Sequence, residues 1–117
     1  MKVVLITGAS SGIGKNIGEY LIKNNFKVYG TCRNPSNYPN SKINLIKSNI
    51  NNIDEINSCI NYIFSNGENI DVLINNAGIG FTGPVEDSNI SDTEKLFSTN
   101  FFGPIEMIKA VLPLMRK

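Results

Sequence analysis

The sequence has no histidine and no tryptophan, and only two of its 117 residues, Cys32 and Cys59, are cysteines. The lack of histidine excludes hydrolases that activate a serine or cysteine nucleophile with an imidazole base. Two isolated thiols without nearby ligand partners predict neither a zinc site nor a disulfide framework. We therefore expect two reduced packing residues and no metal.

Strong charge and long apolar runs are also missing. Eleven Lys and Arg residues oppose ten Asp and Glu residues, so the formal net charge is +1. That balance provides no basic field for nucleic acid or for an anionic membrane surface. The apolar run at residues 3–6 is too short for a signal-peptide core or a membrane span. The expected protein is cytoplasmic, with neither nucleic acid nor a membrane as partner.

Four short segments have the pattern of buried parallel strands. They are residues 3–7, 27–32, 43–47 and 71–75. The first and last contain the continuous apolar runs VVLI and VLI, which are typical of strands covered on both faces. Because helical patterns alternate with these strands, the sequence predicts one α/β domain with a doubly wound parallel sheet.

Helical patterns occupy the intervals between the strands. Apolar residues recur at helical spacing at Ile13, Ile17, Tyr20 and Leu21, and again at Ile53, Ile56, Ile60, Ile63 and Phe64. Two pairs are placed as N-cap and third helical residue, Asn52 with Glu55 and Ser91 with Glu94. The last helix is expected to run towards Met115, with kinks or interruptions at Pro104 and Pro113.

The motif "TGASSGIG" at residues 7–14 joins the first strand to the first helix. Its glycines are Gly8, Gly12 and Gly14, and its hydroxyl donors are Ser10 and Ser11. A helix N-terminus with a glycine-rich entry binds phosphate, because its free N–H groups carry partial positive charge. The spacing fits neither a P-loop nor G-x-G-x-x-G. A plain glycine-rich turn is the alternative, but the flanking strand and helix favour a phosphate site.

Three motifs together resemble the short-chain dehydrogenase/reductase family. The fingerprint T-G-x-x-x-G-x-G is met in the glycine-rich turn, N-N-A-G stands at residues 75–78 after the fourth strand, and Asn100 precedes Gly103 by three residues. The resemblance covers essentially the whole chain and implies a Rossmann-type sheet. Right-handed crossovers then give the strand order 3-2-1-4.

By that resemblance, cofactor-binding residues are expected at four strand ends. They are Gly8, Ser10, Ser11, Gly12, Ile13 and Gly14 after the first strand, Arg33 after the second, Asn49 and Ile50 after the third, and Asn76, Ala77 and Gly78 after the fourth. Strand carboxyl ends are also where open α/β sheets bind ligands in general.

Residues 32 and 33 indicate which nicotinamide cofactor is preferred. NAD-preferring proteins place an acidic residue at the end of the second strand, to bind the ribose 2′-hydroxyl. Here Cys32 and Arg33 stand there, and an arginine can pair with the 2′-phosphate of NADP. NADP is therefore expected rather than NAD. Ser11 stands where some members carry a further basic residue, and a solvated arginine in a polar loop is the alternative.

The resemblance also implies catalysis by a tyrosine with a lysine four residues later, assisted by a serine. Asn100 is expected to belong to a water-mediated proton relay. The literal match Tyr38 to Lys42 is rejected, because Pro39 and its neighbours indicate a loop and the pair needs one helix face. Residues 79–90 are expected to border the site.

We therefore interpret residues 1–117 as the N-terminal, cofactor-binding part of a longer domain. Because a βαβ unit takes roughly 30 residues or more, a stretch of this length holds about four strands. The expected whole protein is an oxidoreductase acting on a small-molecule carbonyl or alcohol, and homo-oligomeric in its full-length form. The given stretch alone is expected to be inactive. A non-catalytic NADP-binding module and an inactive truncated remnant remain alternatives.

Overall fold

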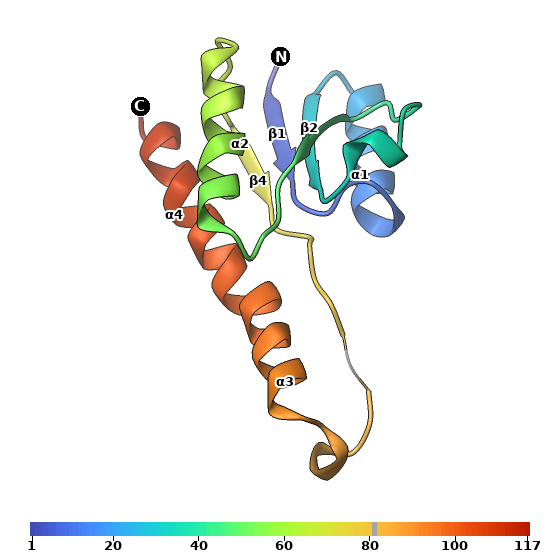
Figure 1. Cartoon of the computed structure of the whole chain (residues 1–117). Coiled ribbons are helices and arrows are strands. Elements are labelled where there is room, and N and C mark those ends of the chain that lie inside the picture. The colour runs from blue at the N-terminus through green and yellow to red at the C-terminus, as the bar shows by residue number, and fades with distance from the viewer. Residues whose placement is uncertain (81) are drawn as a thin grey trace.

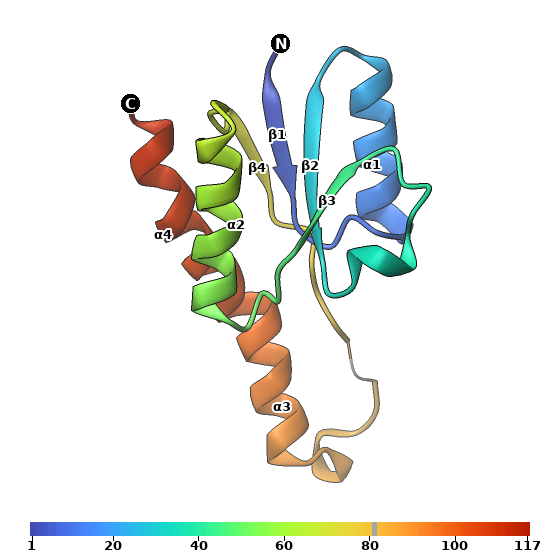
Figure 2. The same ribbon diagram turned by 45° about the horizontal axis from the view of Figure 1, so that its top comes forward.

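The computed structural model describes residues 1–80 and 82–117, which form a parallel sheet between two helical layers (Figures 1 and 2). The strands are β1 (Val3–Ile6), β2 (Lys27–Cys32), β3 (Asn44–Lys47) and β4 (Val72–Ile74). The helices are α1 (Gly12–Lys23), α2 (Ile53–Ser65), α3 (Ile90–Phe97) and α4 (Gly103–Met115). Within the described residues the strand order is β3-β2-β1-β4, which confirms the predicted order.

Alternate residues of the strands enter two separate cores. Val4, Ile6 and Val28 pack with Ile17 and Leu21 of α1 on one face of the sheet. Val3, Leu5 and Tyr29 pack with residues of α2 and α4 on the other face. Both faces of the central strand β1 are covered, which explains its continuous apolar run.

The contact face of α1 differs from the predicted stripe. Ile13 and Tyr20 are 72% and 67% exposed, and the buried residues of the helix are Gly14 and Gly18. A Cβ at Gly18 would lie 2.4 Å from Cδ1 of Ile43. The helix therefore packs through Gly14 and Gly18 together with the predicted Ile17 and Leu21, whereas Ile13 and Tyr20 face solvent.

The stripe of α2 is likewise shifted. Ile56, Ile60 and Ile63 are buried as predicted, but Ile53 and Phe64 are 53% and 46% exposed. Cys59 is buried in the contact face. Burial raises the pKa of its thiol to about 12, so Cys59 is a neutral packing residue. The predicted N-cap is confirmed, since the Asn52 side chain accepts a hydrogen bond from the Glu55 N–H.

The predicted capping box at Ser91 and Glu94 is wrong. α3 begins after Asn89, whose Oδ1 accepts a hydrogen bond from the Asp92 N–H at 2.8 Å. Asparagine is as good an N-cap as serine, and the sequence pattern alone did not distinguish the two.

The predicted interruption near Pro104 is confirmed. A π-helical segment, Ser98–Phe102, separates α3 from α4, and Pro104 occupies the first turn of α4. Proline is tolerated there because an N–H in the first turn has no intrahelical partner. Pro113 does not end the helix, since α4 continues to Met115. α3 extends away from the sheet, whereas α4 packs beside α2 (Figure 1).

Candidate cofactor-binding site

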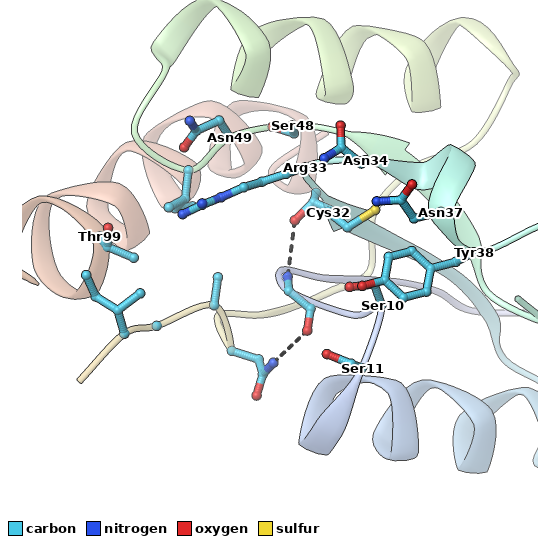
Figure 3. A pocket seen from close by; sticks show the side chains of 17 residues that line it. Ser10, Ser11, Cys32, Arg33, Asn34, Asn37, Tyr38, Ser48, Asn49 and Thr99 are labelled. Atoms are coloured by element: carbon cyan, nitrogen blue, oxygen red, sulfur yellow. Dashed lines mark hydrogen bonds between the residues drawn. The ribbon is translucent and has the colours of Figure 1, made fainter. Parts of the chain in front are cut away.

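A cavity of about 560 Å³ lies at the carboxyl ends of the strands (Figure 3). Its lining comes from the segments that follow all four strands. Of the residues predicted from the sequence, Gly8, Ser10, Ser11, Arg33, Asn49, Ile50, Asn76, Ala77 and Gly78 line it. Gly12, Ile13, Gly14 and Asn100 lie outside the lining, and each has a different place in the fold.

Thr7 and Asn76 tie the glycine-rich turn to the end of β4. The Thr7 Oγ1 atom accepts hydrogen bonds from the backbone N–H groups of Asn76 and Ala77, both at 3.0 Å. The Asn76 Nδ2 atom donates to the carbonyl oxygens of Thr7 and Gly8, at 3.2 and 3.0 Å. Asn76 therefore acts first as a brace that fixes the turn.

The glycines of the motif have two distinct roles. A Cβ at Gly14 would lie 2.4 Å from the Gly8 carbonyl oxygen and 2.5 Å from Asn76 Nδ2, so Gly14 allows this brace to form. Gly12 has φ +60° and nothing within 4 Å of where a Cβ would lie. Its missing side chain leaves open space beside the start of α1 rather than relieving a contact.

The N-terminus of α1 lacks the caps found on α2 and α3. Its N-cap, Ser11, makes no side-chain capping bond, and its first turn has no acidic residue. In contrast, α2 and α3 are capped by asparagine side chains and carry acidic residues in the first turn. The first N–H groups of α1 are therefore left available to an external anion, next to two serines that line the cavity.

The end of β2 brings one charged side chain to the cavity. Arg33 is exposed, and in Figure 3 it extends towards Asn49, away from Ser10 and Tyr38. Cys32 lines the cavity beside it, and partial burial raises the pKa of its thiol above the usual value. Of the described residues that line the cavity, Arg33 is the one that carries a full charge at neutral pH.

Two residues after β3 form the next part of the wall. The Asn49 Oδ1 atom accepts a hydrogen bond from the Asn51 N–H at 3.0 Å, which leaves its second lone pair for another donor. Ile50 packs against α4, where a Cβ at Gly103 would lie 2.5 Å from Ile50 Cγ1. The glycine of the Asn100–Gly103 motif thus permits α4 to approach this wall.

Several lining residues were not predicted. They are Thr31, Cys32, Asn34, Asn37, Tyr38, Ser48 and Thr99. Except for Thr99, they lie at the end of β2 or in the segments that follow β2 and β3. The strand-end rule applied to every residue there would have found them. Ser48 is 5% exposed, and its Oγ is buried without a hydrogen-bond partner, which no sequence pattern signals.

Asn100 lies in the π-helical segment and binds the loop that follows β4. Its Oδ1 accepts from the Ile79 N–H at 2.8 Å, and its Nδ2 donates to the Ile79 carbonyl at 2.6 Å. The adjacent Thr99 lines the cavity. Of residues 79–90, only Ile79 is in the lining, and Phe81 lies outside the described residues.

Tyr38 and Lys42 do not share a helix. Tyr38 follows the 3₁₀ turn η1 (Pro35–Asn37), and Lys42 lies in the loop before β3. Among residues 1–80 and 82–117, no cluster of three metal-ligating side chains is found, and no helix is both long and apolar enough to span a membrane.

Comparisons with known proteins match this geometry to one family. The model described as short chain dehydrogenase matches residues 2–117. A 3-ketodihydrosphingosine reductase of Bacteroides thetaiotaomicron is 40% identical over 116 residues, which are 99% of this chain and 43% of that protein. Retinol dehydrogenase 8 of Homo sapiens is 32% identical over 129 residues, with 99% of this chain and 40% of that protein covered.

Solved structures show the same arrangement. The ligand-free aldohexose dehydrogenase of Thermoplasma acidophilum superimposes with a TM-score of 0.91 at 32% identity, covering 99% of this chain and 45% of that one. An NADPH-bound carbonyl reductase from chicken fatty liver superimposes with a TM-score of 0.87 at 26% identity, covering 100% of this chain and 49% of that one. The chain spans less than half the length of these proteins.

Proposed function

The chain belongs to the short-chain dehydrogenase/reductase family, and on that basis we propose that it binds NADP as part of an oxidoreductase. The proposed reaction is reduction of a small-molecule carbonyl or oxidation of an alcohol. Relatives named as a reductase and a dehydrogenase, and a similar structure solved with NADPH, support this proposal.

The uncapped start of α1 at the edge of the cavity is the observation that carries the proposal. A dinucleotide pyrophosphate needs N–H donors, a partial positive charge and room for close approach. The first turn of α1 offers the donors, Gly12 leaves the space, and the Ser10 and Ser11 hydroxyls lie alongside. The residues present therefore fit the phosphate part of such a cofactor.

The remaining lining would hold the adenosine part. Asn49 retains one acceptor lone pair, and Ile50 offers an apolar surface beside it. Ala77 and Gly78 line the cavity along the end of β4, and a Cβ at Gly78 would lie 3.2 Å from the Asn100 Oδ1 atom. Arg33 would pair with the 2′-phosphate, which is the group that separates NADP from NAD.

When bound, the nicotinamide ring supplies or accepts the hydride. This chain's own residues would bind and orient the cofactor and support the walls of its site. Asn100 fixes the Gly78–Ile79 loop through both of its amide atoms. We propose that it also takes part in a proton relay, with the proton donor supplied by residues other than 1–117.

We further propose that residues 1–117 are the cofactor-binding part of a longer domain, as the share of the relatives covered suggests. Exposed apolar side chains on α4 support a homo-oligomer for the longer form. Two free, buried cysteines are consistent with a reducing compartment such as the cytoplasm.

A non-catalytic NADP-binding module is a second candidate for this stretch. It is favoured by one observation: in the described part of the chain the one tyrosine with a lysine four residues later, Tyr38 with Lys42, does not lie on a helix. Titrating the 117-residue chain with NADPH measures cofactor binding. Assaying NADPH oxidation with a panel of carbonyl compounds then measures catalysis separately. Binding without turnover is expected. If NADPH does not bind, the proposed function is wrong for this stretch.

A further inference from the structure

We propose that Asn51 is a positioning residue that couples the cavity wall after β3 to the π-helical segment that carries Asn100. Its side chain and its backbone N–H bind different segments of the chain, and both of these segments line the cavity. This role rests on the proposed dinucleotide binding, because it concerns what happens in the π-helical segment when the cavity is filled.

The Asn51 side chain holds two consecutive residues of the π-helical segment. Its Oδ1 atom accepts a hydrogen bond from the Ser98 hydroxyl at 2.7 Å, and its Nδ2 atom donates to the Thr99 Oγ1 atom at 3.1 Å. Thr99 is 3% exposed and lines the cavity. These partners are 47 and 48 residues away along the chain. The amide of an exposed residue therefore anchors a buried part of the cavity wall.

The backbone of Asn51 holds the wall that follows β3. Its N–H donates to the Asn49 Oδ1 atom at 3.0 Å, and Asn49 and Ile50 both line the cavity. Packing reinforces the same contact, since a Cβ at Gly103 would lie 2.5 Å from Ile50 Cγ1. The wall proposed for adenosine and the start of α4 are thus joined by hydrogen bonds and by close packing.

The next residue of the segment, Asn100, holds the loop after β4 through its two bonds with Ile79. β3 and β4 are the outer strands of the described sheet, so the two loops come from opposite edges (Figure 2). Residues 98–100 of the π-helical segment therefore bridge loops from both edges. Because both loops contribute to one cavity, a ligand at one loop can influence the other.

The π-helical segment is well placed to respond to such a ligand. Segments of this kind are rare and frequently occur at functional sites. Thr99 is the buried residue of this one, and the preceding helix α3 extends away from the sheet (Figure 1). Side-chain bonds from the loops therefore contribute much of its anchoring. A ligand that prefers the ordered wall shifts the segment towards its ordered arrangement, by an amount equal to its differential affinity.

The test measures amide hydrogen exchange at Gly103, whose N–H donates to the Ser98 carbonyl within the π-helical segment. The full chain is compared with and without saturating adenosine 2′,5′-bisphosphate, which has the adenosine end of NADP and lacks the nicotinamide end. We expect this probe to slow exchange about 5-fold in the parent and to lose that effect in Asn51→Ala. Asn61→Ala, which replaces an exposed asparagine on α2, is the matched control and should behave like the parent.

Asn51→Asp separates the hydrogen bonds from the residue's mere presence. A carboxylate accepts hydrogen bonds from both hydroxyls, those of Ser98 and Thr99, so this variant should keep the effect of the probe. Neither substitution at position 51 removes the backbone N–H that binds Asn49. Exchange at Leu5, which is fully buried in β1, reports global stability and should stay unchanged in every variant.

A parent that binds the probe without slower exchange at Gly103 would overturn the coupling role and leave dinucleotide binding intact. The same conclusion would follow if the slowing persisted in Asn51→Ala, if it were also lost in Asn51→Asp, or if its loss came with faster exchange at Leu5. A parent chain that binds neither the probe nor NADP would instead overturn the proposed function, and this role with it.

Discussion

Asn100 and Ile79 are joined by two hydrogen bonds, one in each direction, between the asparagine amide and the isoleucine backbone. The pair connects the π-helical segment to the loop after β4. The Oδ1 atom of Asn100 would also lie 3.2 Å from a Cβ at Gly78. The asparagine therefore shapes the cavity from outside its lining, whatever its part in proton transfer.

Asn100→Ala should loosen the loop after β4, because the Ile79 N–H and carbonyl lose their partners. Two net hydrogen bonds correspond to about 1–2 kcal/mol of stability in a partly exposed site. Amide hydrogen exchange at Ile79 should accelerate, and NADP affinity should fall. Asn100→Asp keeps the acceptor for the Ile79 N–H and should show a smaller effect on exchange. Unchanged exchange in Asn100→Ala would contradict the bracing role.

Arg33→Asp should shift the preference from NADP towards NAD. The substitution removes a charge-assisted donor and adds repulsion of the 2′-phosphate, which together correspond to about 10- to 150-fold in relative affinity. Dissociation constants for both dinucleotides, measured at two salt concentrations, check this. Arg116→Asp, near the end of the chain and outside the cavity lining, is the control. A ratio that stays constant would show that Arg33 is merely solvated.

Cys32 should serve as a reporter of cavity occupancy. The thiolate is the reactive form, and burial raises the Cys32 pKa, so alkylation should be slow at neutral pH and faster as the pH rises. NADP should slow the reaction further, because Cys32 lines the cavity. Cys59, with a pKa of about 12, should react only after unfolding and is the internal control. Equal alkylation rates of Cys32 with and without saturating NADP would place the ligand elsewhere.

The 117-residue chain should self-associate when studied alone. Large apolar side chains are exposed along the π-helical segment and α4: Phe101, Phe102, Ile105, Ile108 and Leu112. Such patches drive association in soluble proteins. Sedimentation velocity at several concentrations should show oligomers. The double variant Ile105→Glu with Ile108→Glu should reduce them more than Ile53→Glu, which alters an exposed isoleucine on α2. A chain that stays monomeric throughout would contradict this account of the surface.

Strand order and the cavity's location could be predicted from the sequence. The apolar runs at β1 and β4 are local signals, and right-handed crossovers leave few ways to arrange four parallel strands. The cavity then follows from the rule that ligands bind at strand carboxyl ends.

Helix rotation and side-chain pairing could not be predicted in the same way. Ile13 is exposed while Gly14 packs against the glycine-rich turn and Gly18 packs against Ile43 and Ile6, an orientation that depends on tertiary contacts. Likewise, the sequence predicts Asn76 in the cofactor site, where it lines the cavity, but does not signal that its amide nitrogen braces the glycine-rich turn. Partners 68 residues or more apart along the chain are invisible to local patterns.

Dinucleotide binding at the start of α1 is tested most directly by titrating NADP into Gly12→Val and Gly67→Val. Both glycines have positive φ, at +60° and +79°, and both have nothing within 4 Å of the Cβ position, so valine strains the backbone similarly at either site. Only Gly12 lies where a pyrophosphate would approach α1, since Gly67 follows the end of α2. We predict that Gly12→Val abolishes NADP binding while Gly67→Val binds like the parent. Equal affinity in the two variants would contradict the central claim.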